Sequence, residues 1–196
     1  MPSSMATVSY EPIKAVRVLS QQGALPQMVR EAEAATQTFK MGVPLVLSSG
    51  NLQECAFSGA EVVYGVSAEA GHNLTTANTA QELSEGTPPN QASAVITPVG
   101  AWMRDGKVGV YAANGQTVFS AALKTGQVFT QAMVAAGTYL GLTKDGTSGF
   151  WYVDNTDSSG DNAVVQVIGV DSSCPNTVAG GARVYFIFKA ALRFFA

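Results

Sequence analysis

The sequence predicts an all-β protein, built as a small antiparallel barrel or sandwich with an extended N-terminal arm. Two observations lead to this prediction: apolar and polar residues alternate in several short stretches, and Gly, Asn and Asp stand between those stretches. Alternation with a period of two is typical of strands that bury one face, and the intervening residues favour tight turns. We assign residues 1–34 to the arm and residues 35–196 to one domain, with a long surface loop at about 71–93.

The stretch 38–69 shows the alternation most plainly. In two predicted strands every second residue is apolar or small: Val43, Leu45 and Leu47, and then Val62, Tyr64, Val66 and Ala68. Gly42, Gly50, Gly59 and Gly65 interrupt the stretch, as the bends of a small barrel or sandwich require.

Later strands are separated by dipeptides that favour hairpin turns. Asp105-Gly106, Asn114-Gly115 and Asp145-Gly146 each lie between apolar or aromatic stretches, which predicts an antiparallel meander. The final stretch, 183–195, predicts a strand with Val184, Phe186, Phe188, Ala190, Leu192 and Phe194 on its apolar face. Arg183, Tyr185, Lys189 and Arg193 lie on the other face, which predicts either a solvated surface or a positive seam against an acidic partner.

The N-terminal arm admits two interpretations. It is either a flexible terminus or a segment that becomes ordered on a neighbouring subunit. Within it, Pro26 is expected to open a short helix with Leu25, Met28, Val29 and Ala32 on one stripe and with Arg30, Glu31 and Glu33 facing outward.

Composition restricts the classes of function. Only 13% of the residues are charged and the net charge is −3, so we expect no broad nucleic-acid surface, which requires clustered Lys and Arg. No apolar run reaches the length of a membrane span, so we expect no membrane partner. The first residues lack the apolar centre of a secretion signal, so we expect folding in a cytoplasm.

Side chains for catalysis or metal binding do not form motifs. His72, the single histidine, is expected to be a solvated loop residue, and Cys55 and Cys174 are expected to be unbridged thiols. Asp154, Asp157 and Asp161 suit a hydrated turn better than a Ca²⁺ loop, because their spacing is not that of an EF-hand. Trp102, Trp151 and Tyr152 are expected to pack across strands, with a sugar-stacking platform as the alternative. We therefore predict no enzyme, no cofactor and no metal site.

A resemblance adds a functional expectation. The Phe-x-x-Gly-x-Pro-Leu-Val-Leu motif at 39–47 and the Val-Tyr-Gly-Val-Ser-Ala-Glu motif at 63–69 resemble the β-barrel module of tailed-bacteriophage head decoration (cement) proteins. The resemblance covers about residues 35–70 and the closing strand near the C-terminus. It implies a structural virion protein, made in the host cytoplasm, that stabilises the outer capsid surface as a homotrimer by bridging major capsid subunits.

We assign contacts with capsid or neighbouring subunits to nine residues. They lie in the arm, at the start of the long loop and on the last strand: Tyr10, Ile13, Val16, Val18, His72, Asn73, Arg183, Lys189 and Arg193. In the long loop the expected contact surface continues to Asn90. A phage tail or baseplate β-protein and a carbohydrate-binding module remain as alternatives.

Overall fold

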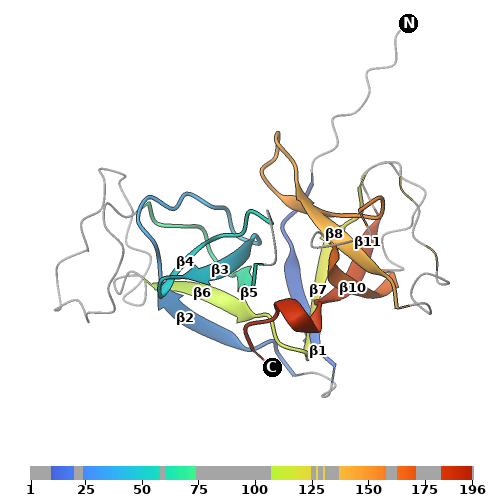
Figure 1. Ribbon diagram of the computed structural model, residues 1–196, viewed down its shortest axis with the longest axis horizontal. Coiled ribbons are helices and arrows are strands. Elements are labelled where there is room, and N and C mark those ends of the chain that lie inside the picture. Colours follow the sequence, from blue (N-terminus) through green and yellow to red (C-terminus); the bar gives the residue numbers. More distant parts are fainter. Residues whose placement is uncertain are drawn as a thin grey trace, which may run out of the picture.

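The fold is two antiparallel β-sheets packed against each other (Figure 1). The computed structural model describes residues 10–19, 24–57, 61–73, 107–124, 127, 130, 137–157, 163–170 and 182–195. All ladders between named strands in these ranges are antiparallel. This confirms the all-β prediction in its sandwich form, and no closed barrel is found in the described part of the chain.

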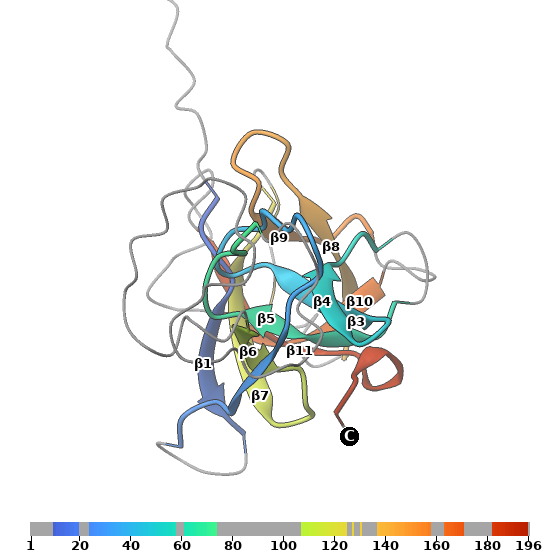
Figure 2. The same ribbon diagram turned by 90° about the vertical axis from the view of Figure 1, so that its left-hand side faces the viewer.

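The five-stranded sheet is built from the stretch in which the alternation is plainest and from its neighbours. It runs in the order β2-β6-β5-β3-β4, with bounds β2 Met28–Ala32, β3 Pro44–Ser48, β4 Asn51–Glu54, β5 Val63–Ser67 and β6 Lys107–Ala112. Figure 2 views the molecule from the side of this sheet. Val43 and Leu45 are fully buried, as the alternation predicts. A Cβ at Gly65 would lie 2.2 Å from the Tyr111 carbonyl oxygen, so glycine is needed where β5 and β6 approach.

The six-stranded sheet runs in the order β1-β7-β11-β10-β8-β9. Its strands are β1 Lys14–Val18, β7 Thr117–Ala122, β8 Tyr139–Lys144, β9 Trp151–Asp154, β10 Ala163–Val170 and β11 Arg183–Phe188. Only β1 comes from the N-terminal segment. The other five strands follow one another along the chain.

The chain repeats one strand order in its two halves. Numbered along the chain, β2–β6 (the first unit) lie in the order 1-5-4-2-3, and β7–β11 (the second unit) lie in the same order. In each unit, the residue after the first strand forms a parallel bridge with the third strand. Glu33, after β2, pairs with Leu52 of β4, and Leu123, after β7, pairs with Val153 of β9. The next amide donates to the same carbonyl in both units, Ala34 to Leu52 and Lys124 to Val153.

The predicted hairpins have three different outcomes. Asp145-Gly146 does lie in a hairpin, between β8 and β9, although the loop spans 145–150 and Gly149 takes the positive φ. Asn114-Gly115 is not a hairpin turn, because β6 and β7 belong to different sheets. There the Asn114 side-chain oxygen accepts the amides of Gln116 and Thr117 and turns the chain from one sheet to the other. Asp105-Gly106 lies outside the described residues.

A tight turn at Ser49-Gly50 joins β3 to β4. Ser48 pairs with Asn51, and both loop residues have positive φ, 51° and 82°. These are the angles of a type I′ turn, whose twist matches that of the flanking strands.

The N-terminal segment is extended, but its helix prediction is wrong. Residues 28–32 form β2, which pairs with β6 along its whole length. A single helical turn is marginal by itself, whereas the ladder satisfies the same backbone groups. β1 pairs with β7, so the described part of the predicted arm contributes an edge strand to each sheet.

The predicted last strand ends earlier than expected. β11 stops at Phe188, and Ala190–Leu192 form a 3-10 turn. The chain then crosses to the other sheet, where the Phe194 amide donates to the Val63 carbonyl and Phe195 packs on Tyr64. The C-terminal residues 189–195 therefore join the two sheets rather than extend one of them, and the C-terminus lies between the two halves in Figure 1.

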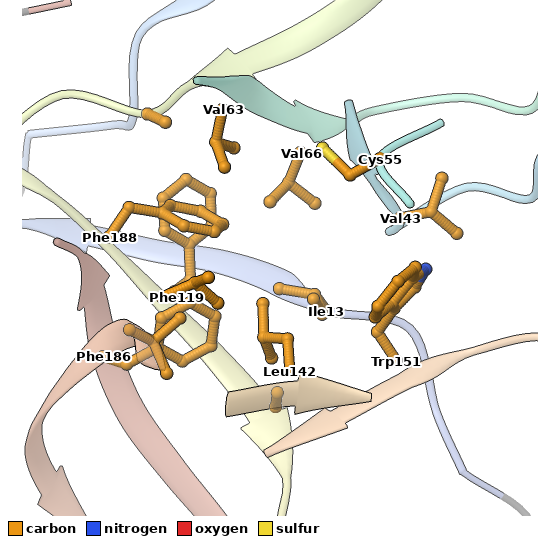
Figure 3. Packing of buried hydrophobic residues seen from close by; sticks show 14 of the residues in the cluster. Ile13, Val43, Cys55, Val63, Val66, Phe119, Leu142, Trp151, Phe186 and Phe188 are labelled. Carbon is orange, nitrogen blue, oxygen red and sulfur yellow. The ribbon is translucent and has the colours of Figure 1, made fainter. Parts of the chain in front are cut away.

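The core continues from one sheet to the other (Figure 3). Ile13 lies between the sheets, with Val43, Val63 and Val66 on one side and Phe119, Phe186, Phe188 and Leu142 on the other. The Phe119 ring lies 5.3 Å from that of Phe188 and 5.8 Å from that of Phe186. The N-terminal segment is thus part of the packing that unites the two sheets.

Candidate functional site

The single histidine is a buried residue, which corrects the prediction of a solvated loop histidine. His72 lies just after β5 and is 9% exposed. Its Nδ1 lies 2.8 Å from Glu33 Oε2, and its backbone amide donates to both Glu33 carboxylate oxygens at 2.8 and 3.1 Å. His72 therefore meets Glu33 through both its ring and its backbone.

Glu33 is fully buried, although the helix prediction placed it on an outer face. It directly follows β2 and forms a single parallel bridge with Leu52 of β4. No sequence motif indicates the pair, because Glu33 and His72 are 39 positions apart and the folding of β2 as a strand brings them together.

The surroundings of His72 favour the charged imidazolium. The hydrogen bond that the Glu33 carboxylate accepts from the His72 ring raises the pKa of His72; burial lowers this pKa, and the nearby Glu69 carboxylate raises it. Glu69 accepts hydrogen bonds from the Gly109 amide and from Arg30. Among the described residues, His72 Nε2 and Glu69 Oε2 are buried atoms without a hydrogen-bond partner. The arrangement can hold a proton between Glu33 and His72. A catalytic triad would need a nucleophile hydrogen-bonded to Nε2, and none of the described residues supplies one.

The acidic turn after β9 is held by the chain itself. The Asp154 carboxylate accepts hydrogen bonds from Lys124 at 2.8 Å, from Gln127 at 2.9 Å and from the Thr156 amide and hydroxyl. In the described ranges, no group of three or more His, Cys, Asp or Glu residues could hold a metal ion. Asp157 contributes its carbonyl to the Gly141 amide, and Asp161 lies outside the described residues.

The aromatic residues considered as a sugar platform pack inside the protein where they are described. Trp151 is 4% exposed and meets the Phe57 ring edge-on at 5.1 Å. Tyr152 stacks on Tyr10 at 4.5 Å. Trp102 lies outside the described residues. Cys55 is a buried free thiol, whose pKa burial raises, and Cys174 also lies outside them.

The predicted contact residues separate into buried and exposed groups. Tyr10 and Ile13 are 7% and 3% exposed and belong to the core of their own chain. Val16 is 42% exposed, whereas Val18 is half-buried. At the start of the long loop, the half-buried Asn73 donates its amide to the Gln37 carbonyl. Of the arm residues predicted as contacts, Val16 alone is exposed.

The positive face predicted for the last strand is not continuous. Arg183 is 7% exposed; it donates to Glu11 at 3.1 Å and to both oxygens of Ser120. Ser120 lies in β7, which pairs with β11, and Glu11 precedes β1 on the other side of β7. This corrects the prediction that Arg183 lies on an outward polar face, whether solvated or covered by an acidic partner. Lys189 lies 5.5 Å above the Tyr139 ring, and Arg193 Nε donates to the Phe188 carbonyl at 2.6 Å.

Exposed apolar side chains concentrate in the N-terminal segment. Of eight large hydrophobic residues exposed in the described part of the chain, four belong to residues 16–28: Val16, Leu19, Leu25 and Met28. Leu25 is 87% exposed and Met28 is 55% exposed. We call these four residues the N-terminal apolar surface; they share one stretch of sequence and lie in or next to the edge strands β1 and β2, which belong to different sheets. Sequence reasoning named Val16 as a contact residue, but it did not name Leu25 and Met28, which it placed on the apolar stripe of a predicted helix.

No helix in the described residues is long and apolar enough to cross a membrane. Searches of protein-family models, of curated proteins and of solved structures found no match to this chain.

Proposed function

We propose that this protein is a structural component of a phage virion that decorates the outer capsid and cements it by bridging major capsid subunits. The proposal rests on the resemblance of residues 39–47 and 63–69 to head decoration proteins. The structural observation that supports it is the N-terminal apolar surface, which a partner of this kind would cover.

The N-terminal apolar surface supplies a physical basis for binding. Complete burial of a Leu, Val or Met side chain contributes about 1.5–3 kcal/mol relative to full exposure. Leu25 and Met28 can gain more than half of that free energy on binding, because they are 87% and 55% exposed in the free protein. Cementing follows by mass action: a protein that binds only the assembled, expanded shell stabilises it by about 2.7 kcal/mol per site at a free concentration 100-fold above Kd.

The direct test is co-sedimentation of the purified protein with expanded, undecorated phage capsids. We expect saturable binding by the wild-type chain. The double variant Leu25→Ser, Met28→Ser should bind at least tenfold more weakly. The matched control is Met41→Ser, Val62→Ser, because these residues are 51% and 41% exposed outside the N-terminal apolar surface. The control should bind like wild type.

Two outcomes would contradict the proposal. Absence of saturable binding by a folded wild-type protein would reject the capsid as partner, and recovery of the protein in tail fractions would then favour a tail or baseplate component. Equal binding by wild type and the Leu25, Met28 variant would reject the N-terminal apolar surface as the contact.

A further inference from the structure

We propose that Glu33 and His72 form a proton-held latch, which fixes residues 71–73 to the segment 33–39 between β2 and β3 and weakens as the pH rises. This latch is independent of the function proposed above. It concerns the point where the chain leaves β5, before it returns at Lys107 in β6.

Each of the residues 71, 72 and 73 forms a hydrogen bond with the segment 33–39. The His72 amide and Nδ1 meet the Glu33 carboxylate, and the Asn73 amide donates to the Gln37 carbonyl at 2.9 Å. The Gly71 amide donates to Phe39 at 2.9 Å. A Cβ at Gly71 would lie 2.7 Å from the Gln37 carbonyl oxygen, so the two segments are in close contact.

The fold itself does not require a charged pair at this place. In the second unit the equivalent bridge residue is Leu123, which is 1% exposed and apolar. A buried carboxylate is costly unless a positive partner compensates it. The first unit therefore carries an added ion pair where the second unit has ordinary apolar packing.

The charged groups around the latch determine its pH dependence. Glu33, which follows β2, and Glu69, which follows β5, favour the charged imidazolium, whereas Arg30 of β2 opposes it. The net effect raises the pKa of His72 above its usual value of 6.5. When the pKa of a group is higher in the folded than in the unfolded protein, its charged form stabilises the fold. This stabilisation is fully present below the unfolded-state pKa and is lost as the pH rises through the folded-state pKa. Above the folded-state pKa of His72, the buried Glu33 carboxylate faces a neutral imidazole ring.

The experiment measures the intact chain as a function of pH. Because His72 is the single histidine, its ring resonances in ¹⁵N-labelled protein give its pKa without ambiguity. Hydrogen exchange of the amides at 71–73, corrected for intrinsic exchange, reports the opening of the latch. We expect a His72 pKa above 6.5 and a protection factor that falls by up to about tenfold per pH unit between 6.5 and that pKa.

Variants separate the latch from general pH effects. His72→Gln should make protection at 71–73 independent of pH in this window, and Glu33→Gln should bring the His72 pKa down toward 6.5. The control variant Glu54→Gln alters the ion pair between Glu54 and Lys144 instead. It should leave the pH dependence of protection at 71–73 unchanged. If Glu33→Gln fails to fold, the wild-type titration still decides. A His72 pKa at or below 6.5, or constant protection at 71–73 across the window, would overturn the proposal.

Discussion

At the scale of single residues, the buried carboxylates have specific partners. Asp154 is 6% exposed, and its donors come from Lys124, Gln127 and Thr156. Burial alone raises the pKa of Asp154, but the hydrogen bonds from Lys124, Thr156 and Gln127 lower it more, so the pKa lies well below its usual range. Asp154 thus ties the segment after β7 to the end of β9.

Replacement of Asp154 by Asn should therefore cost stability in a pH-dependent way. Hydrogen bonds to a charged group contribute about 1.5–3 kcal/mol each, so we expect a loss of roughly 2–3 kcal/mol at neutral pH. A lowered folded pKa gives stability that is present above the unfolded pKa, 3.8, and lost as the pH falls through the folded pKa. Urea unfolding should show a wild-type advantage that is constant above about pH 5 and shrinks below 3.8. An advantage that is unchanged at pH 3 would contradict this assignment.

At the scale of strands and turns, the edge strand β1 carries features that oppose strand addition. Its register with β7 shifts between Ala15 and Arg17, which marks a bulge at Val16, and Lys14 and Arg17 are exposed. Bulges and edge charges discourage pairing with another strand. We therefore expect any partner to meet the side chains of the N-terminal apolar surface rather than to extend the sheet.

Gly50, in the turn between β3 and β4, and Gly146, in the loop between β8 and β9, form a matched pair for substitution by alanine. A Cβ at Gly50 or at Gly146 would have no heavy atom within 4 Å, but only Gly50 has a positive φ, 82°. Gly50→Ala should destabilise the protein by about 1–2 kcal/mol, since alanine is strained in the left-handed region. Gly146→Ala should be neutral or stabilise by up to about 1 kcal/mol. Equal effects of the two substitutions on the denaturant midpoint would contradict the type I′ turn.

Strands were predictable from sequence where one face is buried, and less so elsewhere. Strands β3 and β5 do form in the stretches 43–47 and 62–68, and Val43 and Leu45 are buried as the alternation predicts. At 62–68 the predicted face is wrong, because β5 is buried on both faces and Val62, expected on the apolar face, is 41% exposed. The error at β2 arose because Met28 and Ala32 also fit a helical stripe, and only the partner strand β6 decides between the two. The Asn114-Gly115 error has a similar cause: a turn signal does not say which sheet the next strand joins.

At the scale of the whole molecule, polar contacts reinforce the packing between the sheets. Glu54 of β4 accepts hydrogen bonds from Lys144 Nζ and from Trp151 Nε1, at 2.8 and 2.9 Å. Lys40 lies 5.0 Å above the Phe150 ring. These contacts connect the first unit with the β8–β9 hairpin of the second unit.

The Glu54 contact predicts two unequal substitutions. Glu54→Ala should cost about 1–3 kcal/mol or more, because it leaves the buried Trp151 N–H without its acceptor. Lys144→Met removes only the ion pair, whose lysine side chain is 44% exposed, and should cost less than about 1 kcal/mol. Thermal unfolding monitored by tryptophan fluorescence would compare them. Equal losses would place the energy in the ion pair instead of the Trp151 hydrogen bond.

Two whole-molecule features were beyond sequence reasoning. The repeated strand order links residues about 90 positions apart without a repeated motif, so it is visible only in the sheet topology. The Glu33–His72 pair depends on β2 and the end of β5 meeting in space. By contrast, the expectation that Trp151 packs inside the protein could be drawn from its place next to a hairpin, and its burial confirms it.

The cement proposal is tested most directly by the melting of expanded, undecorated phage capsids with and without this protein. The proposal predicts a higher particle melting temperature that increases with protein concentration until the sites are full, because binding to the assembled shell alone stabilises it. The Leu25→Ser, Met28→Ser variant should require a higher concentration for the same increase. An unchanged melting temperature at saturating binding would contradict cementing, even if the protein decorates the capsid.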